Sequence, residues 1–209
     1  MSFQWIFDRA ESISIDKKAL VGQTITRNQT VRAVSRGAGL WKFTVKLPDG
    51  LKWSEIRPFI EQIENLNRFT SVPVQLTDAG YRDWLTNYRG DCISDVGFNA
   101  SIVKGSDIIT LTSNPAISSG YKFKTGDLIQ IGSIGDGRVY TVKSDVAFNS
   151  NVVTLNRPLT NDTNPNIDLT VGSNVAWRVL CTDMPTWTIF ARDQVSWSGS
   201  FTFIETQLP

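Results

Sequence analysis

The tryptophans of this chain fall into two groups that lie far apart in the sequence. Six of the seven come before residue 92 or after residue 181, at positions 5, 41, 53, 84, 187 and 197. The stretch between them is rich in Gly, Asn, Ser and Thr and has no tryptophan until Trp177. Large aromatic side chains concentrate in hydrophobic cores, so the two ends are predicted to share one domain. The sequence therefore predicts a discontinuous domain, residues 1–91 plus 182–209, and an inserted domain, residues 92–181.

Residues 41–47 show the clearest strand pattern of the first domain. Apolar and polar residues alternate there, the apolar ones being Trp41, Phe43, Val45 and Leu47 and the others Lys42, Thr44 and Lys46. A period of two places the four apolar side chains on one face of a strand. Shorter runs predict further strands at 12–15, 24–26, 31–34 and 73–76, with a turn at Asn28-Gln29.

One segment has the periodicity of an amphipathic helix, residues 54–67. Its apolar positions follow the i, i+3, i+4, i+7 spacing and are Ile56, Phe59, Ile60, Ile63 and Leu66. Ser54 is the predicted N-cap, and Glu55 suits the positive end of the helix dipole. Pro58 lies close enough to the start of the helix to be tolerated.

The C-terminal part alternates again, in two runs. The apolar residues of the runs are Trp187, Ile189 and Ala191, then Trp197, Phe201 and Phe203 with Gly199 between them. Thr188 and Phe190 alternate with the first run, and serine and threonine occupy the other face of the second, which is typical of a half-buried strand. The strand at 41–47 is the best-matched pairing partner for the second run.

The middle segment reads as short strands separated by turns. Strands are predicted at 108–111, 127–131, 138–142 and 152–155, the second and third joined as a hairpin across 132–137. Residues 160–174 are predicted to be loop, and 177–180 returns the chain to the first domain. Five or so short strands in about 90 residues suit a small closed barrel or sandwich. The predicted fold class is mainly β: a β-sandwich-like domain with one α-helix, interrupted by a small β-rich insert.

The composition excludes several kinds of chemistry. The chain has no histidine, so Ser-His-Asp and Cys-His catalysis are excluded for this chain alone, and two cysteines cannot supply the usual zinc ligands. The net charge of +1 gives no global attraction to nucleic acid or anionic membrane. No apolar run approaches the length of a membrane span, and the N-terminus does not resemble a signal peptide. No catalytic, cofactor-binding or metal-binding residue is predicted.

Two features of the predicted hairpin superficially resemble sites. Asp127 and Asp136 lie beside glycines, but Asp-Gly pairs also satisfy the backbone dihedrals of turns. The glycine-rich stretch 132–137 resembles a phosphate-binding loop, yet no helix follows it to hold a phosphate. Both features are interpreted as turn chemistry.

Two further features lie at the predicted domain boundary. Arg89-Gly90-Asp91 matches the tripeptide of integrin ligands, and a simple turn explains it as well. Cys92 and Cys181 would be neighbours if the ends of the insert lie close together. If the protein is made in a cytoplasm, where thiols stay reduced, two reduced thiols are favoured over a disulfide.

Some charged and aromatic residues are candidates for a binding surface. Lys42, Lys46, Lys52 and Arg57 give a local basic tendency, but Asp49, Glu55 and Glu61 are interleaved with them, which favours a solvated or subunit-facing surface. Trp41 and Trp197 are predicted core residues. Trp84 is a candidate interface residue.

The order of these segments resembles distal tail proteins of long-tailed siphophages, in the subfamily with an inserted OB-fold-like domain. The first part of the resemblance covers residues 41–45, 53–68 and 72–76; the second covers residues 100–111, 124–129, 138–142 and 153–159. The pattern Gly-Asp-apolar, Val-Tyr-x-Val, Leu-x-x-Pro-Leu recurs in phage tail proteins. The resemblance implies a hexameric ring at the tail tip that continues the tail tube, leaves a channel for DNA and carries baseplate hub or fibre proteins. It also implies assembly in the host cytoplasm, a virion location, an OB-like barrel insert and no catalytic residues.

Other functions stay open from the sequence. The chain could be another phage tail or adaptor subunit. The insert could instead bind saccharide or single-stranded nucleic acid, as OB folds do, with aromatic candidates Phe98, Tyr121, Phe123, Tyr140 and Phe148. Glycoside hydrolysis by paired carboxylates needs no histidine, but no pair stands out.

Overall fold

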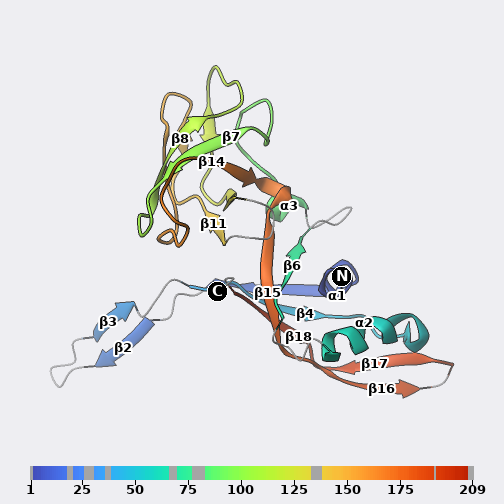
Figure 1. Ribbon diagram of the computed structural model, residues 1–209. Helices are drawn as coiled ribbons and strands as arrows, with labels where there is room; N and C mark the ends of the chain where they lie inside the picture. Colours follow the sequence, from blue (N-terminus) through green and yellow to red (C-terminus); the bar gives the residue numbers. More distant parts are fainter. Residues whose placement is uncertain are drawn as a thin grey trace.

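The computed structural model describes residues 2–17, 21–25, 31–35, 39–65, 70–76, 83–132, 138–190 and 192–206. The fold is mainly β, with several antiparallel sheets and a half-barrel (Figure 1). Part of the predicted helix (Leu66), the predicted turn at Asn28-Gln29, and Asp136 with most of the glycine-rich stretch lie outside the described residues. Among the described residues, no helix has both the length and the apolarity that a bilayer crossing requires.

The first sheet has five strands and is built from both ends of the chain. Its order is β1 (Ser12–Asp16), β4 (Lys42–Lys46), β18 (Phe201–Glu205), β15 (Ala176–Asp183) and β6 (Val72–Gln75). All neighbours in it are antiparallel. The first and last parts of the sequence therefore form one sheet.

The predicted pairing of the 41–47 strand is confirmed. Phe43 lies opposite Phe203, and Val45 lies opposite Phe201. All four apolar residues of the predicted strand are buried, and Lys42 and Lys46 are exposed. Gly199 breaks the second C-terminal run, because its φ of +107° turns the chain between β17 (Gln194–Ser198) and β18. β17 instead pairs with β16 (Thr186–Phe190) and β5 (Leu51–Lys52) in a three-stranded sheet.

The described part of the chain contains three α-helices rather than one. α2 (Trp53–Asn65) is the predicted helix, and it buries Ile56, Ile60 and Ile63. α1 (Ser2–Asp8) was not predicted; it buries Phe3, Ile6 and Phe7, which have the same i, i+3, i+4 spacing over only two turns. α3 (Asp83–Thr86) is a single turn.

The predicted N-cap of α2 is wrong. The helix begins at Trp53, and Asp193 of the β16–β17 hairpin supplies the capping oxygens. The backbone N–H of Trp53 donates to the carbonyl of Asp193 at 2.7 Å, and the N–H of Ser54 donates to its Oδ2 at 3.2 Å. The Ser54 hydroxyl also donates to Oδ2, at 2.6 Å. The carboxylate of Asp193, from another element, thus caps the helix in place of the Ser54 side chain.

The second large sheet has six strands and comes from the middle of the chain. Its order is β11 (Val139–Thr141), β10 (Leu128–Ile131), β14 (Asn164–Val171), β7 (Phe98–Ile102), β8 (Ile108–Ser113) and β13 (Val152–Thr154). Two small antiparallel pairs complete the strands: β9 (Tyr121–Phe123) with β12 (Val146–Ala147), and β2 (Val21–Ile25) with β3 (Val31–Ser35). The predicted hairpin β10–β11 is confirmed.

The prediction of loop at 160–174 is wrong. Residues 164–171 form β14, which lies between β7 and β10 inside the six-stranded sheet. Ile167, Leu169 and Val171 alternate in the sequence, but Asn, Asp and Pro residues around them hide the pattern. The register shift between Asn164 and Ile167 accommodates those residues.

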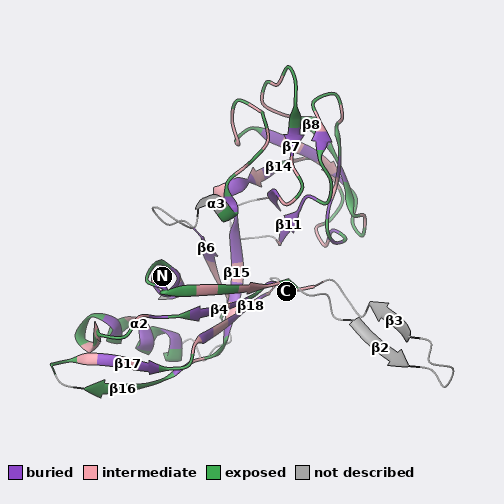
Figure 2. Ribbon diagram, turned by 180° about the vertical axis from the view of Figure 1, so that it is seen from behind, coloured by how far each residue is buried: buried purple, intermediate pink, exposed green. Residues whose placement is uncertain are grey.

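The change of sheet falls earlier than the predicted boundary at residue 181. The 3-10 turn Gly172–Asn174 ends β14, and β15 then pairs with β6 and β18 of the first sheet. Trp177, Val179 and Cys181 belong to the buried cluster of that sheet. A second buried cluster, which includes Phe98, Phe123 and Tyr140, fills the six-stranded sheet. Figure 2 shows buried segments in both parts and along β15 between them.

Candidate functional site

The carboxylate of Asp127, one of the two considered from sequence, is structural. It is 1% exposed and accepts hydrogen bonds from the backbone N–H of Lys124 at 2.8 Å and of Arg89 at 3.2 Å. The guanidinium Nε of Arg89 lies 3.3 Å from its Oδ1. Burial raises the pKa of Asp127, and the hydrogen bonds from Lys124 and Arg89 oppose that shift. Asp127 therefore closes the 124–127 turn and ties Arg89 to it.

The Arg89-Gly90-Asp91 tripeptide is hydrogen-bonded to residues 121–127, the same region that contains Asp127. Besides Asp127, Arg89 hydrogen-bonds the carbonyl of Thr125. The N–H of Asp91 donates to the carbonyl of Tyr121 at 2.8 Å, and its Oδ2 accepts the N–H of Tyr121 at 2.9 Å. The tripeptide thus connects the segment before the insert to the six-stranded region, in agreement with a structural interpretation.

Gly90 has a steric role in this connection. A Cβ at this position would overlap the Tyr88 hydroxyl and the carbonyl of Lys122, which hydrogen-bond each other. The ring of Tyr88 packs against Phe98 and Phe123 at centroid distances of 5.8 Å. Burial raises the pKa of Tyr88.

Neither cysteine forms a disulfide bond. Cys181 is buried in the first cluster and its Sγ lies 3.4 Å from the carbonyl oxygen of Asp183. Cys92 is half-buried against the second cluster. The favoured interpretation from sequence, two reduced packing residues, agrees with this placement.

A buried ion pair joins the two large sheets, and the sequence analysis missed it. Arg157, after β13, and Glu205, at the end of β18, are each 3% exposed or less. Two guanidinium nitrogens of Arg157 donate to the two carboxylate oxygens of Glu205, both at 2.7 Å. The two residues are 48 positions apart, so no local sequence pattern pairs them.

The surrounding hydrogen bonds extend this pair into a network. Arg157 also donates to the carbonyls of Gly39 at 2.9 Å and Val139 at 2.7 Å. The indole N–H of Trp41 donates to the carbonyl of Val139 at 3.1 Å. Because these groups come from both large sheets and the loops beside them, the network fixes the six-stranded sheet against the five-stranded one.

Gln130 makes a second polar link across the same junction. Its side-chain amide donates to the carbonyl of Ala176 at 2.8 Å and accepts the N–H of Ala176 at 3.0 Å. Gln130 is fully buried and lies on β10, whereas Ala176 begins β15. This reciprocal pair continues the hydrogen bonding from the six-stranded sheet to the five-stranded one.

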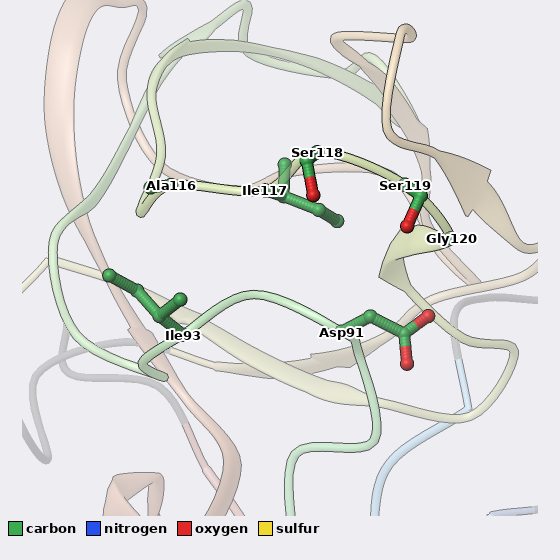
Figure 3. Close-up of a pocket in the computed structure, with 7 residues that line it drawn as sticks. All are labelled: Asp91, Ile93, Ala116, Ile117, Ser118, Ser119 and Gly120. Atoms are coloured by element: carbon green, nitrogen blue, oxygen red, sulfur yellow. The ribbon is translucent and has the colours of Figure 1, made fainter.

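One pocket of about 550 Å³ lies at the rim of the insert (Figure 3). The segment 91–93 forms one side of it, and residues 116–120, between β8 and β9, form the other. The N–H of Ile93 donates to the carbonyl of Ala116 at 3.3 Å and joins the two sides. The volume lies within the range of about 300–1,000 Å³ typical of small-molecule sites.

The remaining candidates have ordinary surface or core roles. Three of the four basic residues considered pair with carboxylates: Lys46 with Glu11 at 2.9 Å, Lys52 with Glu55 at 3.8 Å and Arg57 with Glu61 at 3.7 Å. Trp41 and Trp197 are buried, as predicted. The side chain of Trp84 lies outside the described residues. Within the described ranges, no group of three or more Cys, Asp or Glu side chains is arranged to hold a metal ion.

The aromatic residues of the insert divide by burial. Phe98, Phe123 and Tyr140 are at most 1% exposed and belong to the core. Tyr121 and Phe148 are 42% and 44% exposed. Only the last two, among the five considered, are accessible to a ligand.

No family model and no curated protein matches this sequence. Within the described residues, the structure shows polar connections between the two large sheets and a pocket between residues 91–93 and 116–120.

Proposed function

We propose that the chain is a structural component of a bacteriophage tail tip, a distal tail protein. Six copies would form a ring that joins the tail tube to baseplate hub or fibre proteins and leaves a channel for DNA. The protein would assemble in the host cytoplasm, function in the virion, have no enzymatic activity and use no cofactor. DNA would pass through the channel without being read.

The discontinuous five-stranded sheet is the observation that carries this proposal. β1, β4 and β6 precede the middle segment, and β15 and β18 follow it. A sheet completed by both ends of the chain around a separate β-rich segment has the order of parts that the resemblance to distal tail proteins implies. The buried Arg157–Glu205 pair supports a fixed rather than a tethered second part.

We further propose that the middle segment is an OB-like barrel domain. Its six-stranded sheet and the β9–β12 pair surround a buried cluster of their own, which supports this assignment. The change of sheet at Gly172–Asn174 moves the end of this proposed domain before β15.

The edge strand β16 supports assembly from several copies. All five of its residues are exposed, including Trp187 at 37%, Ile189 at 44% and Phe190 at 45%. β16 ends the three-stranded sheet and carries no charged residue from 186 to 190. An unprotected apolar edge is a site of strand pairing or aggregation unless something covers it. A closed ring of identical subunits covers such an edge.

Native mass spectrometry of the purified full chain tests the proposal. We expect a six-subunit species whose population rises with concentration, and six-fold rings in electron micrographs. A strictly monomeric protein at every concentration, together with no six-fold ring in a map of the virion, would overturn it. A map with the subunit along the tube would favour another tail or adaptor subunit.

A further inference from the structure

The pocket between residues 91–93 and 116–120 has a polar end and an apolar end. The polar lining residues are Asp91, Ser118 and Ser119, and the apolar ones are Ile93, Ala116 and Ile117. In Figure 3 the carboxylate of Asp91 and the hydroxyl of Ser119 lie at the same end as Gly120, while Ile93 and Ala116 lie at the other end. A ligand that fills the space must therefore present polar groups at one end and a hydrocarbon surface at the other.

Backbone geometry holds the carboxylate of Asp91 at this place. Its Oδ2 accepts the N–H of Tyr121, which follows the pocket residue Gly120. Gly120 has a φ of +84°, and a Cβ there would overlap the carboxylate of Asp91. Only glycine combines this backbone conformation with so close an approach. The polar end is thus preformed.

The charge of the lining selects among ligands. Among the described lining residues, Asp91 is the only ionisable one, and none is Lys or Arg. The Nζ of Lys124 lies 3.7 Å from Oδ1 of Asp91, outside the lining, and balances that charge. A nucleic acid needs cations for its phosphates, and here it would meet a carboxylate. A neutral ligand rich in hydroxyl groups fits instead, because carboxylate and serine oxygens accept its O–H groups.

Two exposed aromatic residues lie beside the polar end. Tyr121 follows Gly120 directly, and the N–H of Phe148 donates to the carbonyl of Gly120 at 3.0 Å. The two residues are 42% and 44% exposed. Exposed aromatic rings offer a rigid apolar face, which suits the C–H face of a sugar ring.

We propose that this pocket binds a neutral saccharide, with hydroxyl groups at Asp91, Ser118 and Ser119 and C–H groups against Ile93 and Ile117. The open rim admits either a free oligosaccharide or the end of a longer glycan chain. This proposal does not depend on ring formation, because every residue in it belongs to one copy of the chain.

Saturation-transfer NMR on the full chain tests the proposal, with a panel of neutral di- and trisaccharides of glucose, galactose, mannose and N-acetylglucosamine. The same sugars on an array distinguish free from chain-end binding. Binding of at least one of them is expected. The double variant Ser118→Ala/Ser119→Ala should weaken it about tenfold, since two hydrogen bonds of ordinary strength are lost.

Ser198→Ala is the matched control, because Ser198 is an exposed serine on β17 in another sheet. It should leave the affinity unchanged. The proposal is overturned if no sugar of the panel binds, if the double variant binds as tightly as the unaltered chain, or if a ten-nucleotide oligothymidine displaces the sugar.

Discussion

Replacing Arg157 with methionine is expected to destabilise the fold far more than a single surface ion pair would. The variant Arg157→Met leaves the carboxylate of Glu205, which is 2% exposed, without its cation. The remaining donors to that carboxylate are the backbone N–H groups of Val139 at 3.3 Å and Trp41 at 3.4 Å, both long. Removing one partner of a buried pair typically costs about 3–5 kcal/mol.

Urea unfolding followed by tryptophan fluorescence measures this loss. With an m-value of about 2.5 kcal/mol/M, the midpoint should fall by roughly 1–2 M. The midpoint of Arg157→Lys should lie between those of Arg157→Met and the unaltered chain, because lysine keeps the charge but cannot form the bidentate pair. In the double variant Arg157→Met/Glu205→Leu the orphaned charge is gone, so its loss should be clearly smaller than the sum of the two single losses.

Lys104→Met is the matched control. Lys104 and Asp162 form an ion pair with the same 2.7 Å separation, but their side chains are 62% and 90% exposed. Solvent screening makes such pairs weak, so this variant should unfold at the midpoint of the unaltered chain. The reasoning fails if Arg157→Met loses less than about 1 kcal/mol or if it behaves like the control.

Three further predictions concern the helix cap, the segment before the insert and the thiols. Hydrogen bonds from Ser54 hold the pKa of Asp193 below its usual value, so its stabilisation is present above pH 4 or so and is lost as the pH falls through the lowered pKa. The melting temperature of Asp193→Asn should therefore fall less than that of the unaltered chain as the pH is lowered from about 5 to about 2. The same pH dependence of the melting temperature in both proteins would contradict the capping role of Asp193. Gly90→Ala should lower the melting temperature more than Gly97→Ala, since Gly97 has a φ of +97° but nothing near its Cβ position, and the reverse order would refute the steric role. Ellman's reagent should react at Cys92 alone in the native protein and at both cysteines in urea. Thiols that stay unreactive in urea, in a protein whose mass shows no disulfide and does not change on reduction, would contradict this.

The strand at 41–47 and helix α2 were predictable because each carries its own periodicity. Every second residue of the strand and every third or fourth residue of the helix is apolar. The apolar residues of the strand are buried, and Ile56, Ile60 and Ile63 are buried in the helix. α1 was missed because two turns give too short a pattern. β14 was missed because residues typical of turns obscured the alternation of Ile167, Leu169 and Val171.

The candidate sites show the same difference. The turn interpretation of Asp127 was sound, but its bonds to Arg89 join residues 38 positions apart. The pocket brings together the segments 91–93 and 116–120, and neither carries a motif that indicates saccharide binding. Sequence spacing alone does not bring such groups together.

The sequence by itself determined the local periodicities, the mainly β character and the lack of any histidine chemistry. Only the tertiary structure decided that β15 belongs to the first sheet and that Arg157 meets Glu205 in the interior. The physical reason is that periodicity specifies which face of an element is buried, whereas partners depend on long-range packing. A buried charge then requires its partner from whichever strand that packing brings near.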